Sequence, residues 1–321
     1  MQYKLGFGPM SSEIIELLCE YNKPIMLIAS RNQIDTNSGY VMKTAELSDK
    51  LKTLNTDNIM VCRDHCGPYF LDSEKNLPIN LAIEATKKTI ADDIEHGFNL
   101  IHIDTSRCEE SYEVAEKLIK FCFDLNPSVR FEFGTEENIG VAAGLKKYAD
   151  DVAFAKQFPN MDFVVAQTGS LVYEDRQAGN FNESIAQQLV QIANENLIKL
   201  KEHNADYLTA AEIEQRQIVG IHAMNIAPQL GVIQTKLLRN LSARIADREW
   251  ESFANTVYNS KKWQKWTNGN NLDLAVDVAG HYCFSSLEYK LLLDKLNYNI
   301  DFLSHLKNEL FYILDLYNDN F

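Results

Sequence analysis

Residues 58–71 read NIMVCRDHCGPYFL, and the expected fold is organised around this segment. Its apolar run, residues 59–62, has the composition of a short buried strand, and Asp64, His65 and a Gly-Pro turn follow soon after. Barrels and doubly wound sheets place functional groups at the carboxyl ends of their strands. The segment therefore predicts a strand whose end carries Asp64 and His65 into a functional site. The alternative is that Asp64 caps a turn and His65 is a hydrogen-bonded polar residue without function.

The bulk composition is that of a soluble globular protein. The chain has 321 residues, 45% of them hydrophobic and 24% charged, which is enough for one barrel or two medium domains. A formal net charge of -14 opposes binding to nucleic acid and to anionic membranes. No leader pattern or run of about 20 apolar residues is present, and the six scattered cysteines fit reduced thiols. We therefore expect a cytoplasmic protein without nucleic-acid or membrane partners.

Short apolar runs with strand composition alternate with amphipathic segments, as is typical of a parallel α/β fold. The eight runs are residues 3–7, 25–29, 59–62, 100–103, 130–133, 162–166, 197–200 and 221–226. They predict a TIM (β/α)8 barrel over residues 1–250. A helical extension over residues 251–321 is expected to pack on this barrel.

Local signals predict where several helices begin and end. Gly97 is expected to end one helix, because glycine readily adopts the left-handed conformation. Thr209 and Glu212 have the spacing of a capping box and predict a helix start after the seventh strand. The eighth barrel helix is expected at about 231–246. Two further helices are expected over residues 285–296 and 300–316.

Polar side chains follow most of the predicted strands, and a barrel would bring them to one face. His65 and His203 follow the third and seventh strands, and Asp64, Asp104 and Glu136 also stand at strand ends. Two imidazoles with carboxylates or an amide can complete a divalent-metal site that leaves a position open for substrate. The sequence therefore predicts such a site at the carboxyl face of the barrel.

The other histidines have structural explanations. His96 is expected at a helix C-terminus, His222 at the opposite end of the barrel, and His305 in the terminal helix. His102 lies within a predicted strand and is expected to point toward the helix layer. For His281, a structural role and a position over the barrel mouth both remain open.

Several of these segments resemble motifs of the class II fructose- and tagatose-bisphosphate aldolases. The family motifs read like DH, IDxS, GxxGGEED and GVxKxNI, in the same order and spacing. The matching segments here are Asp64-His65, IDTS at 103–106, GTEE at 134–137 and GIHAMNI at 220–226.

The chain is more similar still to the branch usually named the non-catalytic subunit of tagatose-bisphosphate aldolase. That branch has SNQVD…GGY, DHLGP, HSTDYQT and HYSFS-like motifs. The counterparts here are SRNQID at 30–35 with Gly39-Tyr40, DHCGP at 64–68, HNADYLT at 203–209 and HYCFS at 281–285. The similarity runs from the first strands to near the C-terminus.

The resemblance implies a TIM barrel with a divalent metal, expected to be Zn²⁺, held by His65 and His203. The bisphosphate aldolases have a third metal histidine after strand six, where this chain has Gln167; Gln167 or Glu136 is expected to take its place. Asp64 would exchange a proton with the substrate hydroxyl. Glu136 or Glu137 would move the proton on carbon.

The expected substrate is a phosphorylated ketose or triose. Its phosphate is expected on backbone N–H groups around residues 169–170 and 227–229, assisted by Arg31 or Arg176. The residues expected to contact substrate are Arg31, Asn32, Gln33, Asp35, Asp104, Ser106, Gly169, Ser170, Asn204 and Asn225.

These observations together predict a metal-dependent aldolase that splits or joins a ketose phosphate, with dihydroxyacetone phosphate or a similar three-carbon donor. Two alternatives stay open. One is a non-catalytic barrel that stabilises a separate aldolase subunit, and the other is an isomerase or epimerase that uses the same metal and carboxylates. We expect a homo-oligomer.

Overall fold

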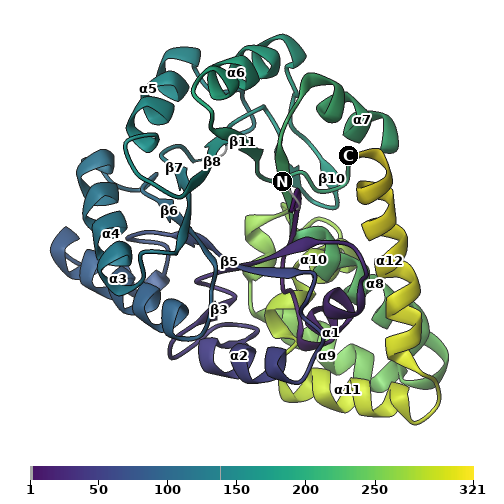
Figure 1. The fold of residues 1–321 in the computed structure, drawn as a ribbon. Coiled ribbons are helices and arrows are strands. Elements are labelled where there is room, and N and C mark those ends of the chain that lie inside the picture. Colours follow the sequence, from purple (N-terminus) through teal and green to yellow (C-terminus); the bar gives the residue numbers. More distant parts are fainter. Residues whose placement is uncertain (1–2, 138) are drawn as a thin grey trace.

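The computed structural model describes residues 3–137 and 139–321 and contains a closed barrel of parallel strands (Figure 1). The strands follow one another around the barrel in the order β1-β12-β11-β8-β7-β6-β5-β2. Their bounds are β1 Leu5–Phe7, β2 Ile25–Ser30, β5 Ile59–Cys66, β6 Leu100–Asp104, β7 Arg130–Gly134, β8 Met161–Ala166, β11 Lys199–Glu202 and β12 Ala223–Ile226. The predicted TIM barrel is confirmed, and each of the eight predicted runs overlaps a barrel strand.

Helices alternate with these strands and surround the barrel (Figure 1). They are α1 Ser12–Glu20, α2 Thr44–Lys52, α3 Ile79–Glu95, α4 Ser111–Leu125, α5 Leu145–Ala155, α6 Glu183–Glu195, α7 Ala210–Val219 and α8 Pro228–Ile245. Gly97 follows the end of α3 with φ 87°, as the glycine signal predicts. Thr209 and Glu212 form the predicted capping box at the start of α7.

Short elements decorate the carboxyl face of the barrel. Two small sheets lie in loops, one of β3 (Ile34–Asp35) with β4 (Met42–Lys43) and one of β9 (Val172–Tyr173) with β10 (Arg176–Gln177). The 3-10 helices are η1 Asp72–Glu74, η2 Lys262–Lys265 and η3 Gly280–Cys283.

Strand β5 is longer than predicted and contains a bulge. The apolar run ends at Cys62, but the strand continues through the Asp-His pair to Cys66. Its register with β6 shifts between Arg63 and Cys66, and His65 has φ 47°, in the left-handed region. A bulge inserts an extra residue and re-aims the side chains beside it. Asp64 and His65 therefore lie within an irregular strand end, not in the loop after it.

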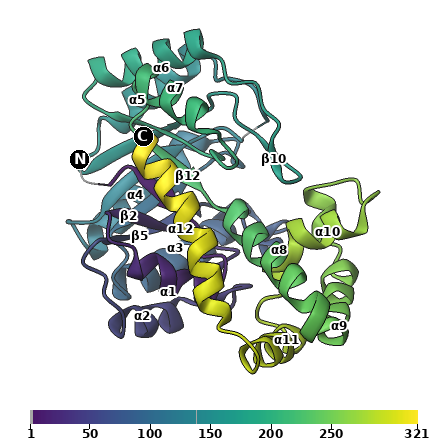
Figure 2. The same cartoon turned by 90° about the vertical axis from the view of Figure 1, so that its right-hand side faces the viewer.

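The C-terminal segment forms α9 (Asp247–Asn259), α10 (Leu272–Ala279), α11 (Leu287–Asn297) and α12 (Phe302–Asn320). Helices α9, α10 and α11 gather beside α8, and α12 runs along the barrel (Figure 2). The buried Tyr317 of α12 donates a hydrogen bond to the carbonyl oxygen of Ala205 at 2.6 Å and accepts one from the Leu208 N–H at 3.2 Å. The terminal helix thus supports the backbone that follows His203.

The helices of the described part of the chain include none that is both long and apolar enough for a membrane span.

A fully buried ion pair joins strand β5 to helix α3. Arg63 Nε and Nη2 donate to the two carboxylate oxygens of Asp93 at 2.7 and 2.5 Å, and both side chains have no exposed area. Arg63 Nη1 also donates to the carbonyl oxygens of Ala29 and Ile34. Because each nitrogen of the guanidinium has an acceptor and the charge has a counter-ion, the guanidinium is tolerated in the core next to Asp64.

We expect Asp93→Asn to destabilise the protein by about 3 kcal/mol, because it leaves the buried Arg63 charge without a counter-ion. Urea unfolding measures this change. The control is Glu84→Gln in the same helix, since Glu84 is exposed and loss of its pair with Lys87 should leave the unfolding midpoint unchanged. Equal unfolding midpoints for the two variants would show that the Arg63–Asp93 pair does not contribute to stability as proposed.

Candidate active site

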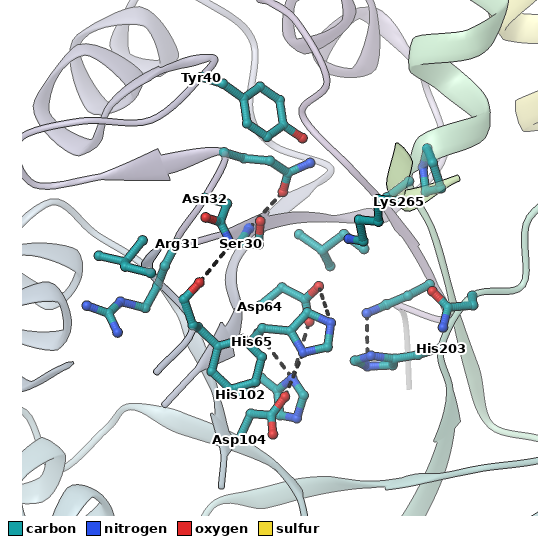
Figure 3. A pocket seen from close by; sticks show the side chains of 18 of the residues that line it. Ser30, Arg31, Asn32, Tyr40, Asp64, His65, His102, Asp104, His203 and Lys265 are labelled. Atoms are coloured by element: carbon teal, nitrogen blue, oxygen red, sulfur yellow. Dashed lines mark hydrogen bonds and ion pairs between the residues drawn. The ribbon is translucent and has the colours of Figure 1, made fainter. Parts of the chain in front are cut away.

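A cavity of about 970 Å³ opens at the carboxyl face of the barrel (Figure 3). Residues at the ends of several barrel strands form its floor. The C-terminal segment contributes to its wall with Trp266, His281 and Tyr282. His281 therefore lies at the mouth; it is buried, and burial followed by the charge of Lys265 lowers its pKa to about 3, so its ring is neutral.

Three imidazoles meet on the floor of this cavity. The ring centroids of His65 and His102 are 5.3 Å apart, those of His65 and His203 5.3 Å, and those of His102 and His203 5.1 Å. One ligand atom from each ring and one carboxylate oxygen of Asp64 all lie within 4.8 Å of one another. The prediction for His102 is wrong: its side chain points into the barrel, not toward the helices, and joins this cluster (Figure 3).

The bulge in β5 explains how two adjacent residues reach one cluster. In a regular strand neighbouring side chains point to opposite faces, so Asp64 and His65 would diverge. Here Asp64 Oδ1 lies 3.2 Å from His102 Nδ1, and Asp64 Oδ2 lies 3.7 Å from His65 Nε2. Gly67 completes the turn, because a Cβ atom there would lie 1.6 Å from the backbone oxygen of Asp104.

Two of the three imidazoles are each within hydrogen-bond distance of a carboxylate. Asp104 Oδ2 lies 2.6 Å from His65 Nδ1, and its Oδ1 accepts from the Ser106 N–H at 3.0 Å. Burial opposes charge on His65, but Asp64 and then Asp104 outweigh it and raise the His65 pKa to about 9. Burial likewise opposes charge on Asp104, yet the hydrogen bond from His65 lowers its pKa to about 2. A proton therefore resides on His65 when no cation is bound.

Glu132 of β7 contacts His203 and was not among the predicted site residues. Its Oε1 lies 2.6 Å from His203 Nε2, and its Oε2 accepts from Lys201 Nζ at 2.6 Å. Burial opposes its charge, but Lys201 and then the histidines depress the Glu132 pKa, so it is an anion inside the barrel. A glutamate inside one apolar run and a lysine directly after another would have indicated such a buried pair.

The donor set fits a divalent metal of the zinc type. Zinc is bound by neutral imidazoles whose second nitrogen is held by a carboxylate, as Asp104 holds His65 and Glu132 holds His203. His102 Nε2 is buried and has no hydrogen-bond partner among residues 3–137 and 139–321. The cluster can therefore offer three nitrogens and one carboxylate oxygen to a cation.

The residues expected to complete the metal site lie elsewhere in the same cavity. Glu136 does not belong to the cluster, and Gln167 Nε2 donates to the backbone oxygen of Glu136 at 3.2 Å. Glu136 is half-buried, and this burial raises its pKa. Glu137 is exposed and pairs with Arg107 Nε at 2.9 Å. The third imidazole of the cluster thus comes from His102 and not from the segment after strand six. Glu136 and Glu137 differ in environment, because Glu136 is half-buried and Glu137 is exposed and paired with Arg107.

Among the residues expected to contact substrate, six lie on the cavity with side chains that remain candidates. They are Asn32, Gln33, Asp104, Ser106, Asn204 and Asn225. Asp35 is buried beneath the cavity, where its carboxylate accepts from Thr89 Oγ1 at 2.7 Å. Gly169 and Ser170 pack away from it, and Ser170 Oγ donates to the backbone oxygen of His203.

The groups expected to bind phosphate are either engaged with other partners or, as for Gly169 and Ser170, do not line the cavity. Arg31 is 1% exposed, and its guanidinium donates to Glu74 at 2.6 Å and points away from the cluster (Figure 3). The N–H groups of Ala227 and Gln229 donate to Asp206 Oδ1 at 3.0 and 2.9 Å. Arg176 is exposed, pairs with Glu174 and does not line the cavity. A phosphate would need other donors.

Solved structures share this fold. A chain described as a probable tagatose 6 phosphate kinase from Sinorhizobium meliloti 1021 is 16% identical, with a TM-score of 0.83 over 99% of this chain and 100% of that one. The YdjI aldolase of Escherichia coli K12 is 13% identical, with a TM-score of 0.54 over 93% and 94% of the two chains.

The fructuronate-tagaturonate epimerase UxaE of Cohnella laeviribosi is 10% identical, with a TM-score of 0.62 over 99% of this chain and 81% of that one. At these identities the likeness concerns the fold. No protein-family model and no curated protein matches the sequence.

We expect the purified protein, incubated with zinc and desalted, to retain about one zinc ion per chain, because the cluster offers three imidazole ligands, the number typical of a catalytic zinc site. His102→Ala should lower zinc affinity by about 100-fold or more, since it removes one nitrogen ligand. Elemental analysis and a competing chelator measure both quantities. His305→Ala, an exposed histidine of α12, is the control and should bind as wild type does. Unchanged affinity in the His102 variant would exclude it as a ligand.

Proposed function

We propose that this protein is a metal-dependent aldolase that cleaves and forms a carbon–carbon bond in a ketose phosphate. The observation that carries the proposal is the convergence of three imidazoles with the carboxylate of Asp64 on the floor of the barrel mouth. His65, His102 and His203 would hold the cation. When bound there, the cation would act as a Lewis acid toward the carbonyl and hydroxyl oxygens of the substrate.

Asp64 is suited to take the proton from the substrate hydroxyl at the bond being cleaved. Burial opposes its charge, but His65, His203 and His102 together depress its pKa well below the usual value. It is therefore ionised at neutral pH. Asp64 also lines the cavity at the end of β5. A general base needs this combination of charge and reach.

Glu136 is the better candidate for the proton on carbon. Its raised pKa brings the carboxyl closer to neutrality, where it can both give and take a proton. Glu137 is less suited because the Arg107 guanidinium holds its carboxylate at the exposed edge. Cleavage beside a carbonyl leaves negative charge on carbon, and Glu136 would return the proton there.

The fold comparisons support this reading at the level of the barrel. Two solved structures with TM-scores of 0.54 and 0.53 carry the names of aldolases, YdjI and a fructose-1,6-biphosphate aldolase from Coccidioides immitis. The segments that resemble class II aldolase motifs support the same roles for Asp64 and His65. The chain also resembles the branch usually named the non-catalytic subunit of tagatose-bisphosphate aldolase, so a second aldolase subunit is a candidate partner.

An epimerase is the second candidate. The similarity to UxaE covers nearly the whole chain, and its TM-score of 0.62 exceeds those of the two named aldolases. Epimerisation by retro-aldol or proton exchange would use the same carboxylates, Asp64 and Glu136. The two candidates differ in whether carbon–carbon cleavage products leave the site.

We expect Asp64→Asn to lower turnover of the active ketose phosphate by about 10²–10⁴-fold, because an amide cannot accept the hydroxyl proton. Fructose and tagatose 1,6-bisphosphates are the first substrates to assay with zinc-loaded protein, and NMR identifies the products. Triose phosphates would indicate aldol cleavage, and a stereoisomer of the starting sugar would indicate epimerisation. Wild-type turnover by Asp64→Asn would refute the proposal, and Glu84→Gln serves as the matched surface control.

Exchange of the carbon-bound proton with solvent distinguishes the role of Glu136 from that of Glu137. In deuterated water, Glu136→Gln should lose deuterium incorporation into the three-carbon donor by about 10²-fold or more, because the amide cannot carry the proton. Glu137→Gln should retain it, since that carboxylate is paired with Arg107 at the edge. The reverse pattern would transfer the role to Glu137.

A further inference from the structure

Cations gather along the outer wall of the cavity, opposite in sign to the carboxylates on its floor. Lys75 and Arg107 come from barrel loops, and Lys262 and Lys265 come from η2 of the C-terminal segment. All four line the same cavity as the histidine cluster. In a chain with a net charge of -14, such a grouping indicates a place for an anion.

Three of these cations already have carboxylate partners. Lys75 Nζ lies 2.7 Å from Asp72 Oδ1, and Lys262 Nζ lies 3.8 Å from Asp72 Oδ2. Arg107 Nε pairs with Glu137, and its guanidinium stacks 4.3 Å from the ring centroid of Phe70. In these pairs, carboxylates balance much of the positive charge of Lys75, Lys262 and Arg107.

Lys265 differs from them because it has no carboxylate within 4.0 Å in the part of the chain that the structure describes. Its Nζ lies 4.6 Å from the ring centroid of Trp266 and points into the cavity (Figure 3). The side chain is solvent-accessible, yet the surrounding walls remove part of its hydration. This desolvation, followed by the charges of Arg107 and Lys262, lowers the Lys265 pKa.

The backbone that carries Lys265 is anchored. Trp266 Nε1 donates to the Tyr282 hydroxyl at 3.2 Å, and the Glu174 N–H donates to the backbone oxygen of Trp266 at 2.9 Å. Thr267 is buried and its hydroxyl donates to Glu174. An ammonium on an anchored segment can bind a ligand with a smaller loss of conformational entropy than one on a free loop.

The other described groups that were expected to bind an anion are engaged or do not line the cavity, which leaves this wall. Arg31 is committed to Glu74, and the N–H groups of Ala227 and Gln229 are committed to Asp206. A phosphate monoester is a dianion at neutral pH and matches an unpaired ammonium with two neighbouring cations.

We propose that Lys265, assisted by Arg107 and Lys262, binds the terminal phosphate of the substrate, so that the C-terminal segment supplies two of the three cations of the phosphate site. The choice of a phosphorylated substrate rests on the proposed function. The carbon chain would then span the cavity from the histidine cluster to this wall.

Titration with inorganic phosphate tests the site without turnover. Calorimetry on the full-length protein should show saturable binding, which Lys265→Met weakens by about tenfold or more, because a charge-assisted hydrogen bond is lost. Lys265→Arg should bind within about threefold of wild type, since the charge is kept. Lys290→Met removes an exposed lysine of α11 as the matched control and should bind as wild type does.

Equal phosphate affinity in Lys265→Met and wild type, or no binding by the wild type, would overturn the site. Acetate is titrated in parallel, and a carboxylate that binds as tightly as phosphate would overturn the assignment to a phosphate ester. His65→Ala should leave phosphate binding intact while it removes metal binding. Inactivity of the wild type on ketose phosphates would therefore refute the aldolase proposal without affecting this result.

Discussion

The bulge at the end of β5 is the constraint on which the site depends. His65 has φ 47°, a conformation that costs a residue with a side chain of order 1–3 kcal/mol. Neighbouring contacts offset this cost: the His65 N–H donates to His102 Nδ1, His65 Nδ1 pairs with Asp104, and Cys66 returns to register opposite Ile103. Without the bulge, strand alternation would separate Asp64 from His65, and no four-residue cluster would form.

Buried carboxylates then set the protonation and orientation of the cluster. Asp104 and Glu132 each face one imidazole, and Lys201 balances Glu132 inside the barrel. A buried anion is stable only when it is paired and hydrogen-bonded, so these contacts also fix the positions of the rings. The barrel interior thus prepares nitrogen ligands for a cation, while the C-terminal segment contributes the aromatic and cationic wall above them.

The sequence predicted Asp64, His65 and His203 because strand ends in a parallel barrel converge, whatever the details of packing. His102 was assigned to the wrong side, and Glu132 was overlooked, for one physical reason. Barrel strands are covered on both faces, so their apolar runs do not alternate in a way that separates interior from exterior positions. Strand tilt and stagger decide whether a polar residue inside such a run faces the barrel interior or the helices. Both depend on all eight strands.

The sequence by itself determined the eight strand-helix units, the capping box at Thr209 and the helix end at Gly97, because these follow from local periodicity and backbone preference. The tertiary structure alone decided which charged groups remain available for a ligand. Arg31 is captured by Glu74, whereas Lys265, distant in sequence from the barrel mouth, reaches it unpaired. Pairing is a property of three-dimensional proximity, and the partners of a charge cannot be read from its neighbours in the chain.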